Sequence, residues 1–182
     1  MVRAVAVVAL LALAGCAGVD DLSSAKGAPG GAVAASPAGS REAALRRKAD
    51  AALAERSYAD AWNLEAAAGS DAERLSAIAV ASLEADRGPY EDMFAALHAK
   101  FGGLPPSARA RVEAVIKAAE SEGAWSRAVN VALVTAADAP TYAAAWAVYE
   151  RAPTKEALGL YRTIQKAQTA HAEKAAPAPP GR

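Results

Sequence analysis

Two stretches of this chain, GPYEDMFAALHAKFGGLP at residues 88–105 and GAWSRAVNVALVTAADAP at residues 123–140, follow one plan. Each opens with a glycine, has an aromatic residue two positions later, and closes with a proline 17 residues beyond the glycine. In the first stretch the apolar residues follow an i, i+3, i+4, i+7, i+11 spacing at Tyr90, Met93, Phe94, Leu97 and Phe101. Each stretch therefore predicts one amphipathic helix that begins beside its aromatic residue.

The same spacing and the same helix breakers divide the central part of the chain into eight short helices. We predict them at 41–56, 58–68, 71–86, 89–101, 106–122, 124–137, 141–151 and 154–170. Ser70 and Glu73 fit a capping box, Pro106 suits a first helical turn, and Thr154 fits an N-cap. Hydrophobic residues make up 53% of the chain, but many are alanine, and no β-branched run suggests a strand. The sequence therefore predicts an all-α fold of antiparallel helical hairpins.

These hairpins recur at a regular distance. Tyr58, Tyr90 and Trp125 each stand just inside the second helix of a pair, and they are 32 and 35 residues apart. The pattern resembles the tetratricopeptide repeat, whose period is about 34 residues. In that family a small residue ends the first helix, an aromatic residue starts the second, an alanine packs the hairpin and a proline ends the unit. Gly123, Trp125, Ala128 and Pro140 match these roles.

The sequence also departs from the repeat. Met93 replaces the alanine in the preceding copy, and Ser57 replaces the glycine in the first copy. Ile116 occupies a position where the family has a small residue, and Pro153 shortens a first helix. A short tetratricopeptide-like array is the leading prediction. Another α-hairpin array and an irregular helical bundle are the alternatives.

The resemblance implies that a partner binds to the inner face formed by the first helices of the hairpins. In the best copy, that face falls at Glu113, Lys117 and Glu120. The competing interpretation, which we favour, is a solvated helix face with the i, i+4 ion pairs Arg109–Glu113 and Glu113–Lys117.

An aromatic stripe at Tyr142, Trp146 and Tyr149 is open to two interpretations of the same kind. Such a stripe with helical spacing usually belongs to the core, and we predict core packing here. The alternative is an exposed docking patch.

A separate signal lies at the start of the chain. Arg3 precedes eleven residues that lack any charge, 4–14, whereas a membrane span needs about 20. The run ends at Leu13-Ala14-Gly15-Cys16, which contains the only cysteine and resembles the lipobox of bacterial lipoprotein precursors. The resemblance implies cleavage between Gly15 and Cys16, with diacylglycerol and an N-acyl chain such as palmitate on Cys16. The alternative is an ordinary secretory signal cleaved after Ala14 or a nearby small residue, with an incidental cysteine.

The predicted organisation has four parts. Residues 1–15 are a signal peptide, and 16–40 are the lipidated cysteine with a tether rich in Gly, Ala, Ser and Pro. Residues 41–172 are the helical domain, and 173–182 are a disordered tail rich in Pro and Ala. Because Ala17 follows the cysteine where an aspartate favours the inner membrane, the resemblance implies an outer-membrane anchor facing the periplasm.

Composition and motifs argue against several function classes. Lys plus Arg and Asp plus Glu both number 20, so no basic surface for nucleic acid is expected. The two histidines, His98 and His171, lie far apart, and no catalytic constellation, metal-spaced cluster or cofactor motif is present. We therefore expect neither an enzyme nor a cofactor beyond the lipid on Cys16.

The leading expectation is a membrane-anchored scaffold for a protein partner in secretion, pilus or envelope assembly. The alternative is a structural or ligand-binding envelope lipoprotein, for example one that binds peptidoglycan.

Overall fold

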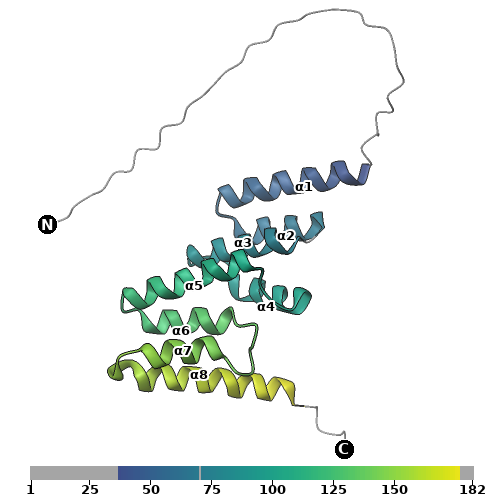
Figure 1. Ribbon diagram of the computed structural model, residues 1–182. Coiled ribbons are helices and arrows are strands. Elements are labelled where there is room, and N and C mark those ends of the chain that lie inside the picture. Colours follow the sequence, from purple (N-terminus) through teal and green to yellow (C-terminus); the bar gives the residue numbers. More distant parts are fainter. Residues whose placement is uncertain (1–36, 70, 177–182) are drawn as a thin grey trace, which may run out of the picture. The chain divides into compact units, whose positions relative to one another are not determined.

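The computed structural model describes residues 37–69 and 71–176, and every regular element within them is an α-helix (Figure 1). This part of the chain forms α1 (Pro37–Ala54), α2 (Tyr58–Ala68), α3 (Ala72–Glu84), α4 (Tyr90–Phe101), α5 (Pro106–Ser121), α6 (Trp125–Val134), α7 (Ala143–Arg151) and α8 (Thr154–Ala175). The all-α prediction is confirmed, and each predicted helix corresponds to one of these eight.

The two outer helices are longer than predicted. Helix α1 begins at Pro37 instead of residue 41, and α8 continues to Ala175 instead of ending at 170. The assignment of 37–40 to a tether and of 173–175 to a disordered tail was therefore wrong. Proline is tolerated at a first helical position, where its missing N–H has no partner to lose. Helix α8 stops at Ala175 because Ala176, which is extended with ψ 131°, precedes a proline that disfavours helical backbone.

The start of α3 corrects the predicted capping box. The N-cap is Asp71, whose Oδ1 accepts hydrogen bonds from the amides of Glu73 at 2.8 Å and Arg74 at 3.4 Å. Ser70, the predicted cap, lies outside the described residues. The Glu73 carboxylate accepts a bond from the Ser107 hydroxyl of α5 at 2.6 Å, and so takes part in a contact between hairpins. Aspartate and serine cap equally well, so the local sequence did not distinguish them.

The repeated aromatic residues occupy equivalent places. Tyr58, Tyr90 and Trp125 are the first residues of α2, α4 and α6. In each case a residue with positive φ lies two positions after the end of the preceding helix, namely Arg56 (60°), Asp86 (51°) and Gly123 (74°). The next amide then bonds back to a carbonyl five residues earlier, as in a Schellman turn. The repeat therefore uses glycine at this turn only once, and Gly88 is not the counterpart of Gly123.

Packing follows the order of hairpins. Each of α1–α2, α3–α4, α5–α6 and α7–α8 joins two helices through a short loop (Figure 1). Between hairpins, α2 packs against α3 and α6 against α7. The odd helices α3 and α5 are in contact, as are the even helices α4 with α6 and α6 with α8.

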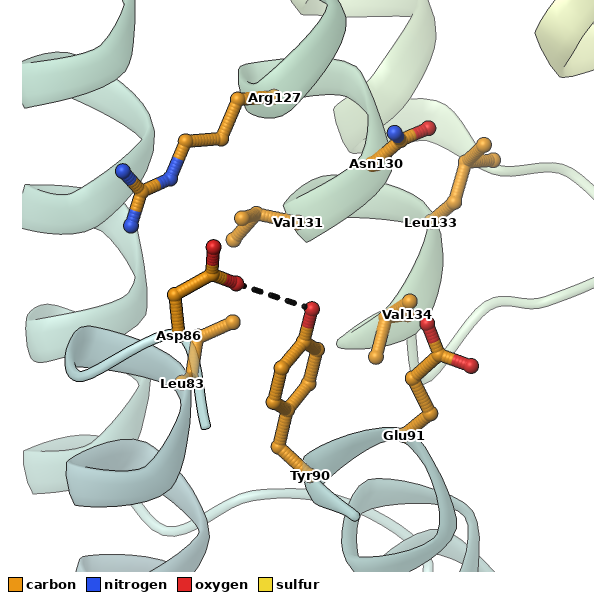
Figure 2. A pocket seen from close by; sticks show the side chains of 9 residues that line it. All are labelled: Leu83, Asp86, Tyr90, Glu91, Arg127, Asn130, Val131, Leu133 and Val134. Atoms are coloured by element: carbon orange, nitrogen blue, oxygen red, sulfur yellow. Dashed lines mark hydrogen bonds between the residues drawn. The ribbon is translucent and has the colours of Figure 1, made fainter. Parts of the chain in front are cut away.

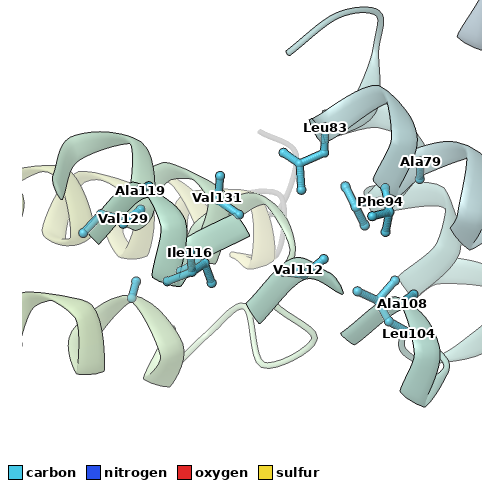
Figure 3. Packing of buried hydrophobic residues seen from close by; sticks show 14 of the residues in the cluster. Ala79, Leu83, Phe94, Leu104, Ala108, Val112, Ile116, Ala119, Val129 and Val131 are labelled. Atoms are coloured by element: carbon cyan, nitrogen blue, oxygen red, sulfur yellow. The ribbon is translucent and has the colours of Figure 1, made fainter. Parts of the chain in front are cut away.

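The buried core runs through these contacts. Phe94 of α4, which is wholly buried, belongs to one cluster with Leu83 of α3 and Val112 of α5 (Figure 3). Ile116 also joins this cluster, at the position where the repeat resemblance favours a small residue. Ala128, the alanine assigned to hairpin packing, has no exposed surface.

Ion pairs connect successive odd helices in a regular way. Each pair joins a carboxylate on one odd helix to an arginine on the next odd helix. The three pairs are Asp50–Arg74 at 2.5 Å, Glu84–Arg111 at 2.6 Å and Glu120–Arg151 at 2.6 Å. Because the donor and acceptor belong to different hairpins, these pairs favour one stacking register over its neighbours.

Candidate functional site

The predicted partner-binding residues of α5 divide into two groups. Glu113 and Lys117 are exposed. Glu120 is largely buried, and its carboxylate accepts a hydrogen bond from Nη2 of Arg151 at 2.6 Å. Glu120 therefore serves as a link to α7, while Glu113 and Lys117 remain available at the surface.

A groove lies between α5 and α7 beside these residues. Its volume is about 220 Å³. It is lined from α5 by Glu113, Ile116 and Lys117, and from α7 by Ala144, Ala147, Val148 and Arg151. We call this the α5–α7 groove. Its floor is apolar, and its rim carries charges of both signs.

A second cavity, of about 310 Å³, adjoins the α5–α7 groove, since Glu113, Ile116 and Ala144 line both. We call it the His98 cavity. Nε2 of His98 lies 3.2 Å from the Thr135 carbonyl oxygen, and Nδ1 is buried without a hydrogen-bond partner among the described residues. The rest of the wall is made of apolar and small residues together with the charged side chains Arg109, Glu113 and Asp138.

The i, i+4 ion pairs predicted along α5 are not among the ion pairs of the described residues. Nε of Arg109 instead donates to the Leu104 carbonyl at 3.0 Å, at the start of its own helix. This bond joins the Arg109 guanidinium to the loop that precedes α5. The interpretation of this face as a set of paired charges was therefore wrong, although Glu113 and Lys117 are solvated as it required.

The aromatic stripe of α7 packs largely as predicted. Tyr142 is buried, and Trp146 and Tyr149 are half-buried against the core. Tyr161 of α8 completes the group, with ring centroids 5.6 Å from Trp146 and 6.2 Å from Tyr149. Tyr161 is itself 44% exposed, so the cluster reaches the surface at one edge. Sequence reasoning missed Tyr161, because nothing local relates a residue of α8 to the stripe of α7.

A third cavity, of about 530 Å³, lies between the α3–α4 hairpin and α6. We call it the Tyr90 cavity. Figure 2 shows the Tyr90 hydroxyl donating to Asp86, with Asp86 and Glu91 on opposite sides of the tyrosine ring; the hydroxyl is 3.4 Å from Oδ1 of Asp86. Arg127 and Asn130, both on α6, also line the Tyr90 cavity. The sequence carried no signal for this grouping, which depends on how one hairpin stacks on the next.

The pKa of Tyr90 reflects these surroundings. Burial raises the pKa of the Tyr90 hydroxyl above its ordinary value, and the negative charges of Asp86 and Glu91 raise it further. Arg127 acts in the opposite direction. The field inside the Tyr90 cavity therefore favours positive charge.

Neither histidine belongs to a metal centre in the described structure. Within residues 37–69 and 71–176, no three His, Cys, Asp or Glu side chains are placed to hold a metal ion together. His171 is on α8 and His98 on α4. Among the helices described, none combines the length and apolar character required to span a bilayer.

The predicted lipobox, with Leu13, the predicted cleavage point after Gly15, and Cys16, lies outside the described residues, as does Ala17. Its assignment therefore continues to rest on the sequence. No protein-family model, no curated protein and no solved structure matches this chain.

Proposed function

We propose that this chain is a lipid-anchored envelope lipoprotein whose helical domain holds an extended segment of a protein client in the α5–α7 groove. The observation that carries the proposal is the groove itself, located beside two of the residues that the repeat resemblance assigns to partner binding. The anchor is the lipid on Cys16, and the membrane is the outer membrane, with the domain facing the periplasm.

The lining of the α5–α7 groove suits a peptide. Ala144 and Ala147 are small, so a bound backbone approaches α7 closely, while Ile116 and Val148 offer apolar contact to its side chains. Glu113, Lys117 and Arg151 on the rim present charges of both signs, so the groove lacks a clamp for a single carboxylate. We therefore expect the client to bind through an internal segment.

The lipid anchor should strengthen binding of a client that is located at the same membrane. A lipid chain confines the domain to a thin layer at the membrane, which raises the effective concentration of any client in the same layer. One acyl chain binds only marginally, whereas the two or three chains of a mature lipoprotein hold stably. These properties fit a scaffold in secretion, pilus or envelope assembly.

The client test fills the groove at Ala144. Ala144→Phe places a large ring in the shared wall of the α5–α7 groove and the His98 cavity, while Ala143→Phe is the matched control on the adjacent exposed position. Full chain carrying either substitution is used in pull-downs from solubilised envelopes. We expect a stoichiometric protein with wild type and Ala143→Phe that is lost with Ala144→Phe. Retention of that protein by Ala144→Phe contradicts the proposal.

The anchor test changes Cys16. Cys16→Ala should abolish incorporation of radiolabelled palmitate and leave an uncleaved or mislocalised precursor. Undiminished labelling of that variant contradicts the lipobox assignment.

A second candidate function is supported by the His98 cavity. Its wall is apolar apart from a few polar and charged side chains, among them Arg109 and Asp138, and so suits a small, mainly apolar ligand, as the alternative of a ligand-binding envelope lipoprotein requires. Sedimentation with purified cell wall in place of protein capture favours the structural alternative.

A further inference from the structure

The Tyr90 cavity has an unequal balance of hydrogen-bonding groups. Asp86 and Glu91 supply carboxylate oxygens, which only accept, whereas the Tyr90 hydroxyl and the Asn130 amide can each donate or accept. Within the described residues, neither carboxylate forms an ion pair. A ligand group that only donates hydrogen bonds therefore matches this cavity better than one that accepts them.

Arg127 is the one cationic side chain in the wall of the Tyr90 cavity. It also lines an adjoining cavity of about 190 Å³, where Glu84 and Glu122 are present. Glu84 is paired with Arg111, and Arg127 forms no ion pair among the described residues, so its single positive charge in the Tyr90 cavity stands against two carboxylates. Asp86 and Glu91 are thus left with a net negative charge directed at the Tyr90 cavity.

The rest of the wall is apolar. Leu83, Val131 and Val134 face the space around the tyrosine ring (Figure 2). An aliphatic stem gains by burial against such side chains, and an ammonium group near the face or edge of a tyrosine gains from its hydroxyl and π-electrons. Lysine combines a four-carbon stem with an ammonium that has three donors and no acceptor.

We propose that the Tyr90 cavity binds a lysine side chain of a protein client, with the ammonium between Asp86 and Glu91 and the stem against Leu83, Val131 and Val134. The identification of the ligand as part of a protein rests on the proposed function. The cavity lies between the α3–α4 hairpin and α6, so it is lined by different residues from the α5–α7 groove.

The test titrates the full chain, purified in mild detergent, with the peptide acetyl-Ala-Ala-Lys-Ala-Ala-amide. Binding is followed by the side-chain amide signals of Asn130 in ¹⁵N NMR spectra, because this group lines the cavity. The same peptide with norleucine in place of lysine keeps the stem and removes the charge. We expect saturable shifts with the lysine peptide and none with the norleucine peptide.

Substitutions in the wall of the Tyr90 cavity test whether its negative charges attract the lysine side chain. Asp86→Asn and Glu91→Gln should each raise the Kd for the lysine peptide about tenfold, the usual effect of losing a charged hydrogen bond. Asp92→Asn removes a neighbouring first-turn carboxylate outside the cavity and is the matched control. Arg127→Gln should lower the Kd severalfold, because it removes a like charge. Circular dichroism confirms that each variant is folded.

Three results overturn the proposal: no saturable shift, equal shifts with the norleucine peptide, or weaker binding by Arg127→Gln, which would assign the ligand to the guanidinium. Its failure is separable from failure of the proposed function. If the lysine peptide does not bind while Ala144→Phe still abolishes client capture, only the lysine site is rejected.

Discussion

Removing the buried carboxylate of Glu65 should destabilise the first three helices. Glu65 lies on α2 and is wholly buried, with Oε2 accepting a hydrogen bond from Nε of Arg74 on α3 at 2.8 Å. Nε of Arg46 on α1 lies 3.5 Å from the other carboxylate oxygen. The carboxylate of Glu65 therefore forms a hydrogen-bonded ion pair with Arg74 and a longer ion pair, without a hydrogen bond, with Arg46.

The expected loss in the free energy of unfolding depends on which contacts Arg46 and Arg74 keep after the substitution. Glu65→Ala removes a charged hydrogen bond, worth about 1.5–3 kcal/mol, and leaves a small void. The stranded arginine side chains are each 36% exposed and retain Asp50 and Glu42 as partners, so they are not left as isolated buried charges. We therefore expect a loss of about 2–3 kcal/mol, below the 3–5 kcal/mol typical of breaking a fully buried pair. Glu65→Gln keeps an acceptor for Arg74 and should cost about 1 kcal/mol.

The assay is urea unfolding of the full chain followed by far-UV circular dichroism, with the free energy of unfolding obtained by linear extrapolation. Glu55→Ala, at an exposed position of the α1–α2 loop, is the control and should change stability by less than about 0.5 kcal/mol. The reasoning is refuted if Glu65→Ala is as stable as this control. It is also refuted if Glu65→Gln is as costly as Glu65→Ala, since the hydrogen bond would then contribute nothing.

Three further predictions concern turns and stacking. Arg56→Gly should raise the free energy of unfolding by about 0.5–1 kcal/mol in urea, because φ is 60° at this non-glycine residue; a loss of stability would contradict it. Asp138→Ala should cost about 1 kcal/mol by removing an oxygen that accepts the Ala143 amide at 3.0 Å. Hydrogen bonds from the Thr141 hydroxyl and from that amide lower the pKa of Asp138, so this stabilisation is present above the unfolded-state pKa of about 3.9 and is lost as pH falls through the lower folded value. The difference in stability between wild type and Asp138→Ala should therefore be constant above that range and disappear below it. A double-mutant cycle of Glu120→Ala and Arg151→Ala should give a coupling of about 0.5–1 kcal/mol that declines in 1 M salt, and a coupling of zero would remove this pair as a stacking contact.

Local signals in the sequence were sufficient for the helices and insufficient for the details of their ends. The aromatic positions were reliable because a large side chain at the start of a second helix packs against its own hairpin. The turns were less predictable: Asp86 takes the left-handed conformation that Gly123 has at the corresponding turn of the next hairpin, and Asp71 caps α3 in place of the predicted Ser70. Several residue types satisfy the same local geometry at similar free energy, so the sequence does not distinguish them.

The candidate sites were predictable only in part. Glu113 and Lys117 were placed correctly at the surface by helical periodicity, which needs no knowledge of other helices. The role of Glu120 was not, because its partner is on the next odd helix, 31 residues away. The Tyr90 cavity was wholly unforeseen, since its walls come from two hairpins.

The sequence by itself determined the number and order of the helices in the described part of the chain, roughly where the hairpins turn, and which face of each helix is apolar. These properties depend on spacing and backbone preference within about ten residues. It also carries the whole case for a lipid on Cys16. Only the tertiary structure decided that Glu120 meets Arg151, that Ala144 borders a groove and that Asp86 and Arg127 share a cavity. Such contacts depend on the fit of side-chain volumes and charges between hairpins, and that fit is not encoded at any fixed distance along the chain.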